Sequence, residues 1–431
     1  MKTLIRTTFG PLCLMIGCTP FVMVMWYVNT ALQGSFAQFF VLIWQQGLLF
    51  TIKQIWAPVF WGSAIAWQMI VSFVLFQFVL IKILPGKTFY GPITPKGNIP
   101  VYKANGISAF IMTVVTFYVL SVHLKLFSPT LIYDHLGEIL GALNIFSLLL
   151  CVGLYFKGRF YPSSTDSGTT GNILFDYYWG SELYPRVAGV NLKMFINCRL
   201  GMMSWGIFLL SYAFKQAEIA YLSSAMVVAV ALQMIYIAKF FIWETGYLAS
   251  LDIMHDRAGF YICWGCLVWV PCIYTSPTMY LVQHPYTFST LTTLTLFVAG
   301  TLAILVNYMA DRQRQWVRAT NGQCLIWRKI PRVTRAKYQT ELGETKENLL
   351  LSSGWWGIAR HFHYVPEITA AFLWSVPALF THFSPYFYVC FLTILLLDRT
   401  QRDDVRCAQK YGQSWQQYCQ YVPYKMMPFI Y

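Results

Sequence analysis

Two arginines near the start of the last third of the chain have a spacing that suits phosphate binding. They lie in the run Asp311–Arg318, which reads DRQRQWVR. In a helix, Arg314 and Arg318 would share one face, because they are four residues apart. Two guanidinium groups on one face suit a phosphate group. The pattern is also typical of basic anchoring at the cytosolic end of a membrane span, and by itself it favours that second interpretation.

The segment 402–419 has the periodicity of a helix with three distinct faces. At about 100° per residue, one face is a polar stripe, the next is apolar and the third is solvated. A helix that turns its polar stripe toward a pocket and an ordinary interfacial helix explain this periodicity equally well. The stripe consists of Asp403, Cys407, Lys410, Tyr411, Ser414 and Tyr418.

The run Gly354–Tyr364, GWWGIARHFHY, combines turn-forming glycines with aromatic side chains. Such a run can stack on a planar ring, although an aromatic belt at a membrane interface has the same composition. His361 and His363 could form half of a metal site, but no nearby acidic or Cys partner completes it. The sequence therefore predicts no metal.

Acidic residues follow the sixth predicted membrane span. Glu244 and Asp252 lie there with His255 and Asp256, and Tyr247 between them is a possible proton donor. Ionisable residues at span ends are commonly interfacial, whereas those turned into a helical bundle are usually functional. The chain contains neither a GxGxxG run after a strand nor a GxxxxGK[ST] run. A nucleotide pocket would therefore be built from helices and loops.

The composition indicates what positions these residues. Hydrophobic residues make up 57% of the 431 residues and charged residues 11%, with a mean hydropathy of +0.50. A soluble domain carries about 25% charged residues. We therefore predict an all-α, polytopic integral membrane protein. Most of the eleven cysteines lie in apolar runs and act as small hydrophobic residues.

Apolar runs predict about ten transmembrane helices. The stretch 36–50 is ambiguous and is interpreted as interfacial or re-entrant. The residues 8–27 lack a small-residue cleavage site, so this run is predicted to be a span and not a signal peptide. The ten spans are 8–28, 59–84, 107–125, 137–156, 200–215, 217–243, 259–281, 289–310, 367–382 and 384–398.

The basic residues fix the orientation of these spans. With ten spans, 26 of the 31 Lys and Arg residues fall on the face that also holds both termini. The opposite face has only Lys53, Lys125 and Lys215. Cytosolic loops carry such an excess, so both termini are predicted to be cytosolic. The net charge of +14 is spread over loops between spans, which argues against nucleic acid as a partner.

Three landmarks in the chain are similar to those of the sterol reductase family. The resemblance runs from about residue 57 to the end, and several other stretches look closest to the 7-dehydrocholesterol reductase branch. The landmarks are Gly180–Arg186 after Thr170–Asn172, Leu351–Tyr364, and Arg402–Gly412 followed by Val422–Tyr424 and the end at Tyr431. The stretches are Leu84–Gly86, Thr94–Gly97, Phe127–Thr130, Glu244–Leu248 and Thr320–Trp327.

The resemblance implies a membrane oxidoreductase that uses NADPH to saturate a sterol ring double bond, most closely the 7,8 bond of a 5,7-diene. Arg314 and Arg318 would hold phosphates, and the sterol would enter from the bilayer. Tyr247, Glu244 and Asp403 are the candidates for the proton path. The rest of the NADPH pocket, in the C-terminal half, would be lined by Leu351, Trp356, His363, Tyr364, Asp403, Cys407, Lys410, Tyr411 and Tyr418.

The resemblance also implies a division of the chain and a location. Residues 1–56 would form an N-terminal span with an interfacial segment. Residues 57–310 would hold spans 2 to 8 and the sterol side, and 311–431 the NADPH-binding half. The membrane would be the endoplasmic reticulum in a eukaryote and the inner membrane in a bacterium.

Five positions depart from the family pattern. His363 replaces Asn, Pro366-Glu367 replaces Gly-Asp, Tyr184 replaces Asn, and Arg314 replaces Lys. His363 matters most, because it alters a residue that the family places beside the cofactor.

Other functions compete with this one. A 14- or 24(28)-sterol reductase is the alternative within the family. A non-catalytic sterol-binding membrane scaffold is the alternative from another class. An isoprenylcysteine-type methyltransferase has a similar C-terminal segment, but the upstream landmarks argue against it.

Overall fold

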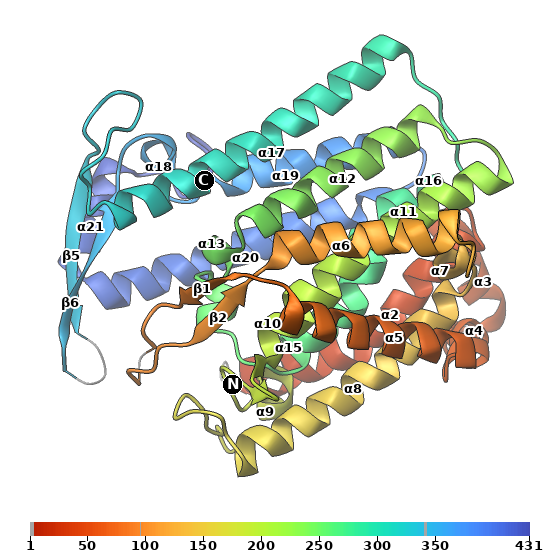
Figure 1. The fold of residues 1–431 in the computed structure, drawn as a ribbon, viewed down its shortest axis with the longest axis horizontal. Helices are drawn as coiled ribbons and strands as arrows, with labels where there is room; N and C mark the ends of the chain where they lie inside the picture. The colour runs from red at the N-terminus through yellow and green to blue at the C-terminus, as the bar shows by residue number, and fades with distance from the viewer. Residues whose placement is uncertain (1–3, 95, 340–342) are drawn as a thin grey trace. The chain divides into compact units, whose positions relative to one another are not determined.

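The chain folds mostly into helices in the computed structural model, which describes residues 4–94, 96–339 and 343–431 (Figure 1). Within these ranges, eight helical stretches are long and apolar enough to cross a membrane. This confirms the predicted all-α, polytopic membrane fold. The stretches are Ile5–Thr30 (α2 and its lead-in), Ala64–Ile83 (α5), Gly106–His123 (α6), Leu136–Phe160 (α8), Leu192–Ile219 (α10 and α11), Ser224–Ile242 (α12), Phe260–Leu281 (α15 and α16) and Thr290–Ala319 (α17).

The two remaining predicted spans take a different form. The predicted span 367–382 is α19 (Tyr364–Ser375) followed by a 3-10 turn, and 384–398 is the first part of α20 (Phe387–Tyr411). Helix α20 continues without a break from its apolar part into the charged segment. The prediction of one separate helix over 402–419 is therefore wrong. Gly412, with φ of +50°, ends α20, and α21 (Gln413–Tyr421) begins after it, because glycine adopts this left-handed conformation at little cost.

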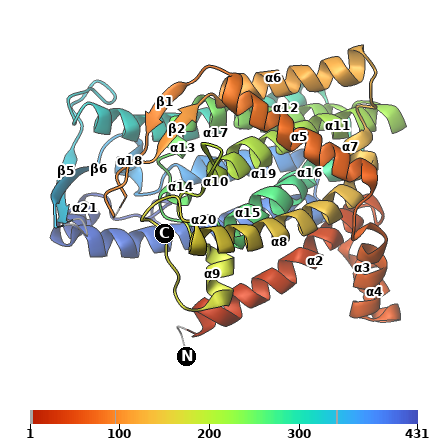
Figure 2. The same cartoon turned by 60° about the horizontal axis from the view of Figure 1, so that its bottom comes forward.

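The ambiguous stretch near the N-terminus forms two short helices. These are α3 (Phe36–Gln46) and α4 (Leu48–Trp56), and they meet at Gly47, whose φ is +84°. Ser35 caps α3 by accepting a hydrogen bond from the backbone of Gln38 at 3.2 Å. Figure 2 shows the two helices as a hairpin beside the end of α2.

The contacts divide the chain into two compact units. The first is formed by residues 4–94, 98–289 and 375–387, and the second mainly by Thr290–Trp374 and Tyr388–Tyr431. The second unit thus begins at Thr290, ahead of the boundary at 311 that the sequence suggested. The predicted three-part division itself stays a prediction.

The first unit is a bundle of apolar helices with short polar elements at one end. Helix α11 (Met202–Ile219) is among its most buried parts, with Trp205 and Tyr212 fully enclosed. The short elements at this end include the paired strands β1 (Lys87–Tyr90) and β2 (Val101–Ala104), the pair β3 (Arg186–Val187) and β4 (Val190–Asn191), and the helices α9 (Ile173–Trp179), α13 (Glu244–Tyr247) and α14 (Leu251–Met254). Helix α7 (Leu131–Asp134) lies at the other end, near α3 and α4 (Figure 1).

The first sequence landmark has a structural role in this unit. A Cβ on Gly180, whose φ is +102°, would lie 2.7 Å from the backbone nitrogen of Gly259. Next to it, Glu182 is buried and pairs with Lys157 at 2.8 Å. The landmark Gly180–Arg186 therefore packs a loop tightly against the start of α15 (Phe260–Trp264).

The second unit combines three long helices with an antiparallel hairpin. Strands β5 (Val333–Gln339) and β6 (Thr345–Leu351) pair with Val333 opposite Leu351. Figure 1 shows this hairpin beside α21 and the last turns of α17. Two apolar clusters fix the arrangement. One holds Ala336, Leu350, Tyr411, Trp415, Tyr418 and Val422, and the other Val317, Ile326, Leu349, Leu351 and Trp356.

Candidate functional site

All eleven predicted cofactor residues belong to the second unit. They come from the end of α17, the end of β6, the segment around α18 (Trp355–Ile358), and the helices α20 and α21. Segments more than a hundred residues apart are thus brought together. The arrangement within this unit can be followed residue by residue.

Arg314 lies flat on an aromatic ring. Its guanidinium is 4.1 Å from the ring centre of Trp356. The indole nitrogen of Trp356 donates a hydrogen bond to the carbonyl of Ala310 at 2.7 Å, so the ring is fixed to α17. Asp311 lies 3.6 Å from the Arg314 guanidinium. Cation–π stacking of this kind orients the guanidinium fork while one edge stays accessible.

Arg318 is one turn further along α17 and is exposed. It interacts electrostatically with Arg314, and also with Tyr411 and Tyr418 from the C-terminal helices. Two like charges held this close repel each other unless an anion lies between them. The pair that the sequence suggested could therefore hold an anion, and its role in phosphate binding stays a prediction.

The segment after β6 forms a wall of closely packed aromatic rings. His363 lies 4.8 Å from Trp356 and 4.1 Å from Tyr364, measured between ring centres, and His361 stacks on Tyr364 at 5.5 Å. The backbone carbonyl of His363 accepts a hydrogen bond from Asn307 at 2.8 Å. These rings are buried, and such a wall can receive a planar ring.

A glycine turn permits this wall to approach α17. Gly354 has φ of +63°, and a Cβ there would collide with the side-chain amide of Gln313. The same amide oxygen accepts a hydrogen bond from the backbone nitrogen of Trp355 at 2.8 Å. The glycine that the sequence pattern showed is thus required by a close contact.

A carboxylate and an imidazole face each other behind the wall. Asp403 on α20 is 3.8 Å from Nε2 of His361 and 3.7 Å from Arg406. Burial lowers the pKa of His361 to about 4, so its ring is neutral at pH 7. With His361 neutral, Arg406 at 3.7 Å remains as a cationic partner of Asp403, whose side chain is 20% accessible.

The remaining predicted residues lie where α20 ends. Lys410 sits over the ring of Tyr338 at 3.8 Å, and the hydroxyl of Tyr411 accepts a hydrogen bond from Asn348 at 2.9 Å. Burial raises the pKa of the Cys407 thiol to about 12, so the thiol keeps its proton. Tyr418 and Leu351 are buried in the two apolar clusters of this unit. Asp403, Cys407, Lys410 and Tyr411 follow one face of α20.

Sequence reasoning missed a buried arginine that closes the site. Arg360 donates hydrogen bonds to the carbonyls of Val422 at 2.8 Å and Pro423 at 3.0 Å, and it pairs with Asp404 at 3.3 Å. It thereby ties the ring wall to α20 and to the C-terminal segment. A charged residue inside an otherwise aromatic run was the only signal for this role.

The other two proton-path candidates belong to the first unit. The carboxylate of Glu244 pairs with Arg199 at 2.6 Å and accepts a hydrogen bond from the backbone nitrogen of Gly106 at 2.7 Å. Both side chains are buried, and an ionised carboxylate held this way accepts protons but has none to donate. Tyr247 packs its ring 4.6 Å from that of Phe240.

The second unit thus offers an anion site, a planar ring wall and a protonated thiol among buried tyrosines. A dinucleotide with phosphates and a flat ring fits these features. No group of three or more metal-binding side chains was found within residues 4–94, 96–339 and 343–431.

Comparison with known proteins covers the whole of the described chain. The model of the "Ergosterol biosynthesis ERG4/ERG24 family" matches residues 4–431. The chain is 51% identical over 429 residues to the 7-dehydrocholesterol reductase of Arabidopsis thaliana, covering 99% of this chain and 98% of that one. It is 34% identical over 397 residues to the 7-dehydrocholesterol reductase of Danio rerio, covering 88% and 83%. It is 35% identical over 433 residues to the Delta(14)-sterol reductase of Methylotuvimicrobium alcaliphilum, covering 98% and 95%.

Proposed function

The chain belongs to the ERG4/ERG24 family of sterol reductases, and on this premise we propose that it reduces the 7,8 double bond of a 5,7-diene sterol with NADPH. It is a multi-pass membrane oxidoreductase of sterol biosynthesis. The choice of bond is carried by one observation, the 51% identity along 99% of the chain to a 7-dehydrocholesterol reductase. The stretches Glu244–Leu248 and Thr320–Trp327 support the same choice.

The second unit supports NADPH as the cofactor. Bound there, NADPH would supply the hydride. Arg314 and Arg318 hold its phosphates, since two guanidinium groups on one face of α17 match two anionic oxygens. Trp356, His363 and Tyr364 receive its flat ring. The role of the protein is to position that ring and to exclude water from it.

An isolated alkene is a weak base, so its protonation requires an acid placed beside it. We propose that a side chain of the protein is this acid. General-acid catalysis is worth roughly 10²- to 10⁴-fold in rate. A conjugated diene gives an allylic cation, which forms more easily, so a modest acid suffices. Asp403, whose side chain is partly exposed, and Tyr247 are the stronger candidates for this proton. Glu244 is the weaker candidate, because its charge is engaged by Arg199 at 2.6 Å.

His363, the main departure from the family pattern, is compatible with the proposed cofactor site. Its ring contacts those of Trp356 and Tyr364, tilted by 31° and 43° to them, so it extends the aromatic wall. We therefore propose that this substitution preserves cofactor binding through ring contacts.

A 14-reductase activity is the second candidate, because the chain is also 35% identical to a Delta(14)-sterol reductase. The test supplies the purified protein with NADPH and, separately, 7-dehydrocholesterol, an 8,14-diene sterol and a 24(28)-unsaturated sterol. Loss of the ultraviolet diene absorbance with 7-dehydrocholesterol, and cholesterol as the product, would support the proposal. Turnover of only one of the other two sterols would refute it.

A further inference from the structure

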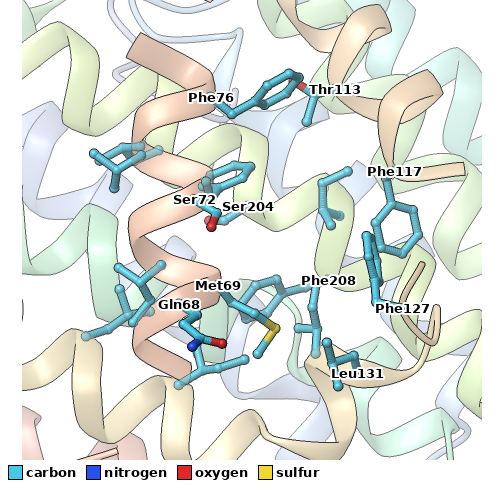
Figure 3. A pocket seen from close by; sticks show the side chains of 18 of the residues that line it. Gln68, Met69, Ser72, Phe76, Thr113, Phe117, Phe127, Leu131, Ser204 and Phe208 are labelled. Carbon is cyan, nitrogen blue, oxygen red and sulfur yellow. The ribbon is translucent and has the colours of Figure 1, made fainter. Parts of the chain in front are cut away.

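The first unit contains a large cavity that the reduction chemistry leaves without a role. Its volume is about 510 Å³, within the range of pockets that hold small molecules. It is lined by α5, α6, α7, α8 and α11, together with the chain between α6 and α7. Figure 3 shows side chains of α5 and α6 facing one another across it.

The wall of the cavity is almost entirely hydrocarbon. Six phenylalanines line it, and its lining contains no charged side chain. The cavity opens to the outside of the helical bundle, since Ile65 and Ser72 in its wall are exposed. Water gains little in such a site, since it finds few polar partners there. The natural occupant is therefore an apolar molecule from the bilayer. The six rings are those of Phe73, Phe76, Phe117, Phe127, Phe146 and Phe208.

Two polar side chains, Gln68 and Ser72, lie next to each other in this wall. Gln68 and Ser72 are four residues apart on α5, so they share one helix face, and both are exposed. Neither side chain makes a hydrogen bond within the part of the chain that the structure describes. An amide without a partner is costly in lipid. One hydroxyl can donate to Gln68 and accept from Ser72, which satisfies both.

The apolar wall and the polar pair Gln68 and Ser72 together indicate which kind of lipid fits the cavity. An acyl chain of a phospholipid has no polar group to meet Gln68, and an anionic head group would find no cation in the wall. An uncharged molecule with a rigid apolar body and a single hydroxyl matches both the rings and the amide. Sterols have this chemistry, and a membrane in which a sterol reductase works contains them.

The cavity is separate from the predicted proton donors. Glu244 contacts Gly106 at the first turn of α6, whereas the cavity begins at Thr113 on the same helix. Seven residues of helix correspond to about 10 Å, which is beyond the reach of proton transfer. Neither Glu244 nor Tyr247 lines the cavity.

We propose that this cavity is a second, non-catalytic sterol site, in which Gln68 and Ser72 bind the hydroxyl and the phenylalanine rings hold the sterol body. The inference goes beyond the proposed function, because no reaction occurs there. Its occupant supports the packing of α5 against α6 and α8.

The test uses the full chain in bilayer nanodiscs and a fully saturated sterol that carries a photoreactive group. The labelled peptides are mapped by mass spectrometry. We expect labelling of 64–83 and 106–123, and at least tenfold less in Ser72→Trp, which fills the cavity. Leu75→Trp is the matched control, since Leu75 is exposed on the same helix and does not line the cavity. It should label as the native chain does.

Gln68→Leu, which is nearly isosteric, keeps the test decisive if the tryptophan variant fails to fold. Photolabelling of the peptides 64–83 and 106–123 should be several-fold weaker in Gln68→Leu than in the native chain. Equal labelling in the native chain and Gln68→Leu, or equal labelling of these peptides by a photoreactive phospholipid, would overturn the proposal. Labelling in a preparation that reduces none of the supplied sterols would support this inference while removing the proposed function. Reduction of 7-dehydrocholesterol without any labelling would support the proposed function and overturn the second sterol site.

Discussion

At the scale of single residues, much of the candidate site was visible in the sequence. Helical spacing placed Arg314 beside Arg318, and the structure brings both to one end of α17. The spacing of residues along the chain could not predict which side chain each arginine contacts. The stacking of Arg314 on Trp356 at 4.1 Å joins positions 42 residues apart, and no local pattern encodes such a contact. Arg360 was missed for the same reason, since its partners lie at the end of the chain.

We predict that Arg318→Ala weakens NADPH binding by roughly 10- to 150-fold, the usual worth of a hydrogen bond to a charged group. The loss should be smaller for NADH, which lacks the extra phosphate. Arg312→Ala is the matched control, because Arg312 is an exposed arginine of the same helix that was not predicted to bind phosphate. Equal affinities of the native chain for NADPH and NADH would contradict the assignment. Binding is measured by titration of the purified protein.

Asp403→Ala should remove most of the reductase turnover while the chain still inserts into the membrane. The reason is its place behind the ring wall, where its carboxylate lies 3.8 Å from Nε2 of His361. Asp398→Ala provides the comparison, since Asp398 is an exposed carboxylate on the same helix. Turnover by the Asp403 variant close to that of the native chain would show that the cofactor pocket was misassigned.

His361 gives the protein a predictable response to acid. Its pKa in the folded state is about 4 and its ordinary value is 6.5. Between these values the unfolded chain binds the additional proton, so stability is complete above about pH 6.5 and is lost as the pH falls toward 4. His361→Asn should show a flatter fall in thermal stability across this window. An unchanged pH profile in the variant would assign the acid sensitivity to other groups.

At the scale of elements, the sequence pattern predicted which helices exist better than it predicted where each helix begins and ends. Apolar length located eight long helices, because burial in lipid requires it. The break at Gly412 was missed because the 100° pattern continues smoothly through it. The hairpin of α3 and α4 was ambiguous for a related reason, since its turn depends on the left-handed backbone of Gly47.

Replacing Gly412 by alanine tests this break. Its φ of +50° strains any residue with a Cβ, so Gly412→Ala should lose about 1 kcal/mol or more of stability and weaken NADPH binding. The binding loss follows because α20 would tend to continue and displace Tyr418. Gly153→Ala is the control. A Cβ at Gly153 in α8 meets nothing within 4 Å, so this variant should be neutral or slightly stabilising. Similar melting points for the two variants would contradict the prediction.

At the scale of the whole molecule, the charge asymmetry predicts the topology. With 26 of 31 basic residues on one face, tags at both termini should be accessible to protease on the cytosolic side of sealed vesicles. A tag inserted beside Lys125 should be protected. Opposite exposure of the two termini would mean an odd number of spans. Proteolysis with and without detergent distinguishes these outcomes.

The division of the chain into interleaved units has a consequence for biosynthesis. The ribosome releases the arginines of α17 about a hundred residues before the segment that holds the ring wall in place through Arg360 and the carbonyls of Val422 and Pro423. A nascent chain therefore completes its first membrane spans before the contacts that hold its candidate site can form. A chain that ends before α21 is expected to insert into the membrane but to lack the contacts that Arg360 makes with Val422 and Pro423.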